Sequence, residues 1–103
     1  MRIGKVIGKV TLGKCHPSLR GATWVIAAPL YVGALAEGTK THSAQQDFQG
    51  EPLVAFDALG AGIDALITLS EGAEAAAPFA PEQKPIDAYN SAILDNVTIK
   101  LNL

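Results

Sequence analysis

A segment of small residues carries the spacing in this chain that comes nearest to a binding motif. Gly60-Ala61-Gly62-Ile63-Asp64-Ala65 matches the pattern G-x-G-x-x-G/A of dinucleotide-binding loops, and the apolar run at residues 53–57 precedes it as a strand would. That motif also needs a following helix, whose N-terminus binds the pyrophosphate. Residues 66–70 are too few and too β-branched for that helix. The pattern therefore favours a tight strand-to-strand connection, with nucleotide binding by Gly60-Ala61-Gly62 as an alternative.

Residues that could bind a metal ion or act as a nucleophile are few. The single cysteine, Cys15, lies next to His16, and His42 is far along the chain. A structural zinc site uses four ligands from spaced pairs, which one copy of this chain does not offer. A nucleophilic cysteine needs a positioned base, and an adjacent residue rarely points the right way. We therefore expect no metal site, no cofactor and no catalytic residue.

The acidic and aromatic residues form no obvious catalytic or base-stacking group. Asp57 and Asp95 each end an apolar run, where a carboxylate more often accepts backbone N–H groups of a turn than takes part in catalysis. Trp24, Phe56 and Tyr89 are isolated from one another in the sequence. We interpret them as anchors of a core or an interface rather than as a platform for nucleotide bases.

Length and charge bound the class of protein. The chain has 103 residues, of which 49% are hydrophobic, so we expect a single domain over residues 1–103 with one modest core. Its net charge is −2 and Lys and Arg form no cluster, which counts against nucleic-acid binding. The longest apolar stretch, residues 22–36, is interrupted and shorter than the roughly 20 residues of a membrane span. With one cysteine and no signal-peptide pattern, the sequence predicts a soluble, intracellular protein.

Hydrophobic patterning predicts the elements that position these residues. Strands are expected at residues 1–12, 22–28, 53–57 and 65–70, and a fifth ends at residues 93–94. The pair Gly4 and Gly8 suggests a bend or a bulge in the first strand. A mostly β barrel or sandwich of five to six short strands follows from this pattern.

Three further segments complete the expected organisation. The prolines at positions 78, 81 and 85 allow at most one short helical turn, around residues 73–77. Residues 97–103 alternate apolar and polar side chains, which predicts a strand that pairs within the domain or with a neighbouring chain. A long polar stretch at about residues 36–50 is expected to be a variable, exposed loop.

Four segments, in this order, resemble one known family. They are Met1-Arg2-Ile3-Gly4-Lys5-Val6-Ile7-Gly8, His16-Pro17-Ser18-Leu19-Arg20-Gly21, Leu53-Val54-Ala55-Phe56-Asp57-Ala58-Leu59-Gly60-Ala61-Gly62, and Pro85-Ile86-Asp87-Ala88 with Ile93-Leu94-Asp95. Together they are similar to the vertex proteins of bacterial microcompartments, the pentameric shell family of carboxysomes and of ethanolamine and propanediol compartments. The chain departs from the family at Tyr89-Asn90-Ser91, where members carry a more apolar run.

The resemblance implies a small barrel of the oligonucleotide-binding (OB) type that is used without nucleic acid. It implies a homopentamer that fills the five-fold vertices of a cytoplasmic shell otherwise built from hexameric proteins, with no enzymatic activity. Asp57, Gly60, Ala61 and Gly62 would then lie in the contacts near the five-fold axis, where tapering subunits favour small residues. Two alternatives stay open: an OB-type nucleic-acid-binding module, and a small-ligand or nucleotide-binding subunit of an enzyme complex.

Overall fold

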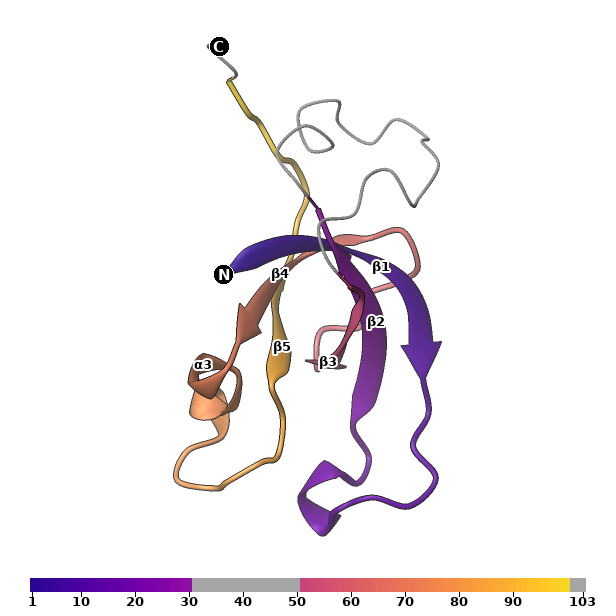
Figure 1. Ribbon diagram of the computed structural model, residues 1–103, viewed down its shortest axis with the longest axis vertical. Coiled ribbons are helices and arrows are strands. Elements are labelled where there is room, and N and C mark those ends of the chain that lie inside the picture. The colour runs from indigo at the N-terminus through magenta and orange to yellow at the C-terminus, as the bar shows by residue number, and fades with distance from the viewer. Residues whose placement is uncertain (31–50, 101–103) are drawn as a thin grey trace.

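The computed structural model describes residues 1–30 and 51–100, and within them the chain folds into a five-stranded barrel. The strands are β1 (Arg2–Val10), β2 (Thr23–Pro29), β3 (Leu53–Asp57), β4 (Leu66–Glu71) and β5 (Ala88–Ile93). Around the barrel they follow the order β1-β2-β3-β5-β4 (Figure 1). Neighbouring strands are antiparallel except for β3 and β5, which are parallel. The mostly β, OB-like barrel expected from the sequence is therefore confirmed.

Short helical pieces lie in two of the connections. η1 (Pro17–Leu19) separates β1 from β2, and α3 (Ala73–Ala76) and η2 (Ala77–Phe79) separate β4 from β5. α3 is the single turn predicted around residues 73–77, and Pro78 lies inside η2, where a longer α-helix would lose a hydrogen bond. The exposed loop expected at about residues 36–50 lies outside the described residues.

β1 bends so that one strand can serve two sides of the barrel. Its first half, Arg2–Lys5, pairs with β4, and residues 4–10 pair with β2. The register with β2 shifts between Val6 and Gly8, which marks the expected bulge. A Cβ atom at Gly4 would lie 2.8 Å from Leu69 Cδ1, so a larger residue there would require the Leu69 side chain to move. The prediction from the two glycines of the first strand is confirmed.

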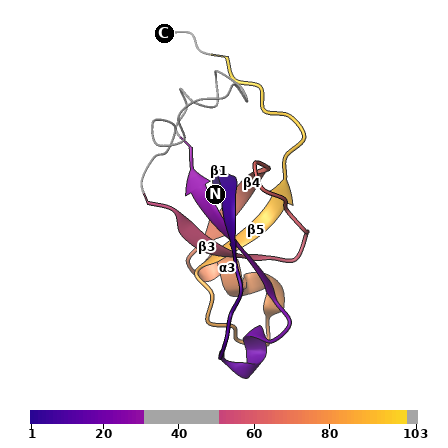
Figure 2. The same cartoon turned by 90° about the vertical axis from the view of Figure 1, so that its right-hand side faces the viewer.

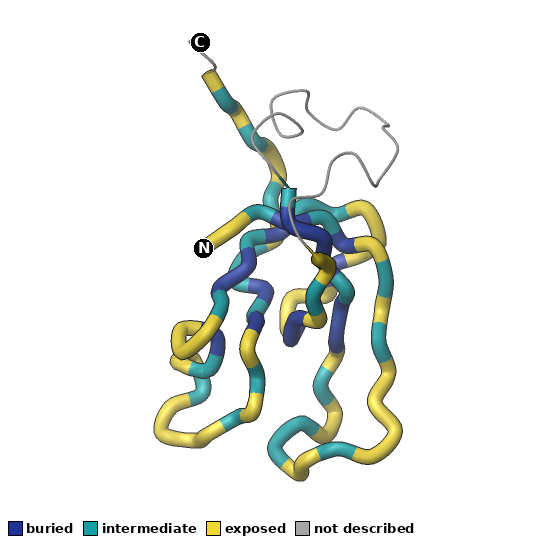
Figure 3. The backbone as a smooth tube through the Cα atoms, viewed as in Figure 1, coloured by how far each residue is buried: buried dark blue, intermediate teal, exposed yellow. Residues whose placement is uncertain are grey.

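The core of the barrel is built from small apolar side chains. Figure 3 shows the buried residues gathered along the strands, while the connecting loops are mostly exposed. The cluster at the centre consists of Val6, Val25, Ala27, Ala55, Ala61, Ile67, Leu69 and Ala88. Half of these residues are alanines, which bury little apolar area each. A domain this small gains further stability when exposed surface is covered by another copy.

The aromatic residues that are isolated in the sequence meet at one end of the barrel. Phe56 contacts Trp24 edge-on with ring centroids 5.3 Å apart, and its ring stacks on Tyr89 at 5.9 Å. Phe79 from η2 packs against Phe56 at 5.0 Å, and Lys84 Nζ lies 5.0 Å from the centroid of Phe79. Trp24 and Phe56 are buried, which confirms the interpretation of these residues as core anchors. Phe79, which the sequence did not single out, holds the connection between β4 and β5 on the barrel.

Removing the ring of Phe79 tests this anchoring. We expect Phe79→Ala to lower the free energy of unfolding by about 2 kcal/mol, less than for a fully buried phenylalanine because Phe79 is half-buried. Phe79→Leu keeps apolar area but loses the edge-to-face contacts, so about 1 kcal/mol should be lost. Urea unfolding at one fixed protein concentration measures both values. A Phe79→Ala variant as stable as the unchanged protein would contradict the anchoring role.

An ion pair joins the first residue of β1 to the last residue of β4. Arg2 Nε donates to Glu71 Oε2 at 2.8 Å, and Arg2 Nη2 donates to Glu71 Oε1 at 2.5 Å, which is a side-on, bidentate arrangement. The hydrogen bond from Arg2 is the main cause that lowers the pKa of Glu71, and it raises the pKa of Arg2 in turn. Both side chains keep much of their exposure, so water screens the pair and its contribution is small.

The depressed pKa of Glu71 predicts a pH dependence of stability. The folded chain binds a proton at Glu71 less readily than the unfolded chain does. The ion pair therefore stabilises the fold fully at pH values above the pKa of Glu71 in the unfolded chain, which is about 4.3. It is lost as the pH falls through the folded pKa. We expect Glu71→Gln to lower stability at pH 7 by no more than about 1 kcal/mol, and this deficit to become smaller at pH 3. Urea unfolding at both pH values checks this, with Glu74→Gln on an exposed residue as control. A Glu71→Gln deficit that is the same at both pH values would contradict the assignment.

Residues 97–100 have no regular structure in the single chain, so the prediction of a strand that pairs within the domain is wrong for them. Figures 1 and 2 show the chain leaving the barrel after β5. The physical reason is that the five described strands close the barrel without this segment, so enclosing the core does not require a sixth strand. Val97 and Ile99 are half-buried while Thr98 and Lys100 are exposed, so the alternation itself remains. Pairing with a neighbouring chain stays a prediction, and residues 101–103 lie outside the described residues.

Candidate functional site

The small-residue segment after β3 forms a tight turn organised by one carboxylate. We call residues 57–65 the glycine corner. Asp57 Oδ1 accepts the backbone N–H groups of Leu59 at 3.0 Å and Gly60 at 3.2 Å, and Asp57 Oδ2 accepts that of Ala61 at 2.9 Å. The carboxylate is 2% exposed. The reading of Asp57 as a residue that caps a turn is therefore confirmed, and the carboxylate fixes the shape of the corner from inside.

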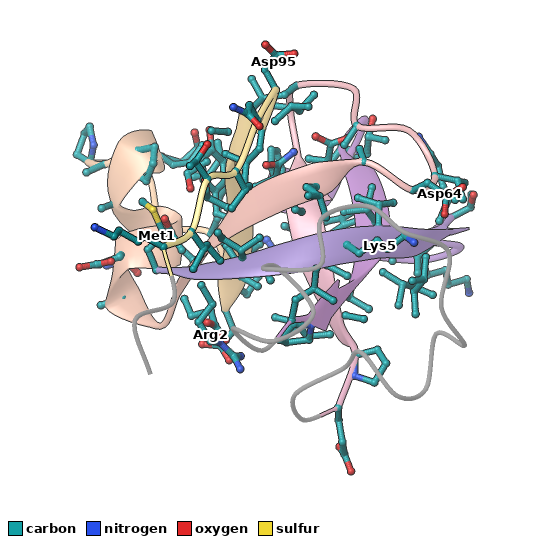
Figure 4. All side chains as sticks on the ribbon, turned by 90° about the horizontal axis from the view of Figure 1, so that it is seen from above. Met1, Arg2, Lys5, Asp64 and Asp95 are labelled. Carbon is teal, nitrogen blue, oxygen red and sulfur yellow. The ribbon has the colours of Figure 1, made fainter. Side chains whose placement is uncertain are left out.

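The C-terminal end of the glycine corner, Asp64 and Ala65, is hydrogen-bonded to the bend in β1. Val6 N–H donates to Ala65 O at 2.9 Å, and Asp64 N–H donates to Val6 O at 2.8 Å. Asp64 has a φ of 74°, a left-handed conformation that Asp tolerates better than most residues. Its carboxylate lies 3.7 Å from Lys5 Nζ, and Figure 4 shows the two side chains on the same side of the barrel. Both ends of the corner are thus held by the barrel.

The four residues expected near a contact between copies fall into two pairs. Asp57 and Ala61 are buried within the single chain, and Ala61 belongs to the barrel core. Gly60 and Gly62 are exposed. The first pair can affect a contact with another copy by shaping the corner, whereas the second pair is available to touch one.

An apolar rim surrounds the two exposed glycines. The side chain of Leu59 is 50% exposed and that of Ile63 is 55% exposed, and Ala58 is exposed as well. Residues 58–63 therefore present small or apolar groups to solvent at every position except the buried Ala61. Exposed apolar side chains that lie close together in the chain make this segment a candidate for contact with another protein.

The backbone conformation requires glycine at position 60 but not at position 62. Gly60 has a φ of 82°, where a side chain strains the backbone, so the turn itself explains this residue. Gly62 lies outside the left-handed region, and a Cβ atom there would meet nothing within 4 Å in the described chain. Nothing in the described part of one copy therefore requires glycine at position 62.

The geometry of the corner disfavours a phosphate-binding loop. The N–H groups of Leu59, Gly60 and Ala61, which a phosphate would need, are already bound by Asp57. The segment leads into strand β4 and not into a helix, as the sequence predicted. An open hollow of about 460 Å³ borders the corner, and its lining residues from 21–23 and 56–60 include one acid and no base. An anionic ligand finds no positive charge there.

The residues considered for metal binding or nucleophilic chemistry have local structural roles or lie elsewhere. His16 Nδ1 accepts the N–H of Ser18 at 3.1 Å and so caps η1, and Cys15 is half-buried. Within residues 1–30 and 51–100 no three His, Cys, Asp or Glu side chains converge on a common point. His42 is outside that part of the chain. The same two ranges contain no helix with the length and hydrophobicity that crossing a membrane requires.

Comparison with known proteins places this barrel and its corner in one family. The family model described as "Ethanolamine utilisation protein EutN/carboxysome" matches residues 1–95. The carboxysome shell vertex protein CcmL of Synechococcus elongatus is 31% identical over 100 residues, covering 97% of this chain and 89% of that protein. The chain belongs to the EutN/CcmL family.

Solved structures agree with this assignment. CcmL of Gloeobacter violaceus superimposes with a TM-score of 0.74 at 26% identity, covering 96% of this chain and 90% of that one. GrpN, described as a pentameric microcompartment shell protein from Rhodospirillum rubrum, gives a TM-score of 0.72 at 27% identity and covers 98% of this chain and 100% of that one. The resemblance seen in the sequence is therefore confirmed over nearly the whole chain.

Proposed function

We propose that this protein is a structural component of a bacterial microcompartment shell. In this proposal residues 1–103 form one shell-vertex domain, and five copies close into a ring that caps a five-fold vertex among hexameric shell proteins. The protein then resides in the shell, within the cytoplasm, and carries out no catalysis. Support comes from family membership, from relatives named as shell vertex proteins, and from one relative named as pentameric.

One observation on the structure of this chain supports the proposal independently of its relatives. Within the glycine corner, Ala58, Leu59, Gly60, Gly62 and Ile63 expose small or apolar groups, and Gly62 has no requirement for glycine within the described part of one copy. In a cyclic ring the same heterologous contact is repeated until it closes, and subunits that taper toward the axis bring their backbones close together. The single chain gives no reason for glycine at position 62, so close approach of the neighbouring copy can be the reason that a side chain is absent there.

The rival functions have less support. Nucleic-acid binding by an OB-type barrel needs a basic, aromatic surface, whereas the net charge is −2 and the aromatic residues Trp24 and Phe56 are buried. Nucleotide binding by the corner needs backbone donors that Asp57 occupies.

Assembly of shells tests the proposed function. We expect hexameric shell proteins produced alone to give open or elongated assemblies, and addition of this protein to give closed, faceted particles that contain it. Electron microscopy of the purified particles distinguishes the two forms. Gly13→Val, outside the corner, should still close the particles, whereas Gly62→Val should not, although a Cβ atom meets open space at both positions in the single chain. Absence of the protein from shells assembled with its own hexameric partners would contradict the proposal.

A further inference from the structure

A polar side chain is buried in the interior of the barrel. Asn90 of β5 is 0% exposed and lies opposite Leu69 in the pairing of β5 with β4. Its Nδ2 donates to Asp57 Oδ1 at 2.9 Å, and its Oδ1 accepts no hydrogen bond among the described residues. A buried amide with one unpaired oxygen is costly, so the bond to Asp57 is the interaction that can account for its presence.

The bond between Asn90 and Asp57 lies between the two neighbouring strands of the barrel that share the fewest paired residues, β3 and β5. β3 and β5 pair at a single position, Phe56 with Tyr89, whereas every other neighbouring pair of strands shares at least four. Asp57 and Asn90 directly follow that one pair. Their side chains therefore continue the connection between β3 and β5 beyond the point where backbone pairing stops.

Among the described residues, the same bond is the one hydrogen bond to the Asp57 carboxylate that comes from outside the corner. Its other three hydrogen bonds come from Leu59, Gly60 and Ala61, which belong to the corner itself. Those three bonds hold the corner together as a unit but do not tie the carboxylate to another strand. Asn90 does so, because it belongs to β5, the neighbour of β3 in the barrel.

We infer that Asn90 is a positioning residue that, by closing the β3–β5 joint through Asp57, fixes the orientation of the glycine corner toward the neighbouring copy. The part of this inference that concerns the neighbouring copy rests on the proposed function. The part that concerns the corner is a property of the single chain. In this inference the buried pair of Asn90 and Asp57 acts on the uniqueness of the corner's arrangement more than on overall stability.

Asn90→Val separates positioning from general stabilisation. The substitution removes the bond to Asp57 but also removes the unpaired Oδ1, and these two effects are of the same order and opposite sign. We therefore expect a nearly unchanged thermal midpoint. Hydrogen exchange at the amides of Leu59, Gly60 and Ala61 should become faster by at least about tenfold relative to amides of β2. The matched control is Ser91→Ala on the same strand, because Ser91 bonds to Thr68 and Ser70 and not to Asp57.

Asn90→Asp adds a readout that a purely structural role would not change. Two carboxyl groups at hydrogen-bond distance cannot both ionise, so the pair retains a proton to a higher pH than either group would in the unfolded chain. The folded chain then binds more protons, and its stability falls as the pH rises. Asp57 is the one ionisable side chain among the residues lining the adjoining hollow, and position 90 faces it from β5. We expect corner protection and ring formation in Asn90→Asp to be lost as the pH rises, with no such change in Ser91→Ala.

The experiment uses the intact chain with three variants, Asn90→Val, Asn90→Asp and Ser91→Ala, whose folding is first checked by circular dichroism. Exchange at the corner amides is followed by NMR, and the number of copies by native mass spectrometry. Fast corner exchange in Asn90→Val and acid-dependent protection in Asn90→Asp support the inference. Corner exchange equal to that of Ser91→Ala, or an Asn90→Asp variant that is indifferent to pH, overturns it. A chain that stays single at every concentration rejects the ring, while the exchange result still decides the role of Asn90.

Discussion

Asp57→Ala is expected to lower the free energy of unfolding by about 3–4 kcal/mol. The substitution leaves four donors without an acceptor: the N–H groups of Leu59, Gly60 and Ala61, and Asn90 Nδ2. Leu59 and Gly60 are exposed enough to bind water instead, but Ala61 and Asn90 are buried. Each buried donor without a partner costs about 1–3 kcal/mol, which gives the expected total. For a domain of this size the melting temperature should fall by more than about 12 °C.

The matched control for Asp57→Ala is Asp95→Ala. The two acids look alike in the sequence, because each ends an apolar run, but Asp95 is exposed after β5 and its carboxylate points away from the barrel (Figure 4). We expect its loss to change stability by less than about 0.5 kcal/mol. Urea unfolding at one protein concentration measures both, since assembly would otherwise contribute to the apparent stability. Equal effects of the two substitutions would show that the corner does not depend on its carboxylate.

Gly62→Val is expected to abolish the ring while leaving the single chain folded. A Cβ atom at position 62 meets nothing within 4 Å in the described chain, and the backbone is outside the left-handed region. The added methyl groups would instead meet the neighbouring copy. Overpacking a close contact costs about 1–3 kcal/mol, which weakens each contact roughly 5- to 150-fold, and every copy in a ring makes two.

Two further variants make the Gly62 result specific. Gly60→Val should also weaken the ring, but it strains the backbone at a φ of 82° by about 1–3 kcal/mol, so it destabilises the single chain as well. Gly13→Val adds the same side chain at another open position outside the corner and should leave the ring intact. Light scattering after size exclusion gives the mass of each variant. A Gly62→Val protein that keeps the mass of the unchanged assembly would remove Gly62 from the contact.

The sequence predicted the fold well where a local pattern determines structure. β3 begins and ends as expected at Leu53 and Asp57, because its buried positions lead directly into an acid that caps the corner. The short α3 turn follows from the prolines around it, and the bend in β1 follows from Gly4 and Gly8. In each case the responsible residues are neighbours in the sequence.

Interactions between distant segments could not be predicted in the same way. The alternation of apolar and polar residues at 97–100 does not say which strand, of the same copy or of another, would pair with this segment, so the predicted pairing within the domain was wrong there. Asn90 was missed as a partner of Asp57 because a polar residue in a strand normally faces solvent, and the register shift beside it was not visible. Phe79 was missed because it lies in a proline-rich connection and meets its partners across the fold. An Asn at an inward-facing position of a predicted strand, two residues after Ala88, is the sequence signal that could prompt the search for a carboxylate partner.

The mass of the native assembly tests the central claim most directly. Native mass spectrometry of the purified, unchanged protein should give five times the 10.7 kDa of one chain, with the same value over a range of micromolar concentrations. That result is expected if the glycine corner closes a cyclic contact between identical copies. A single-chain mass at every concentration, or a closed ring with a number of copies other than five, would contradict the account.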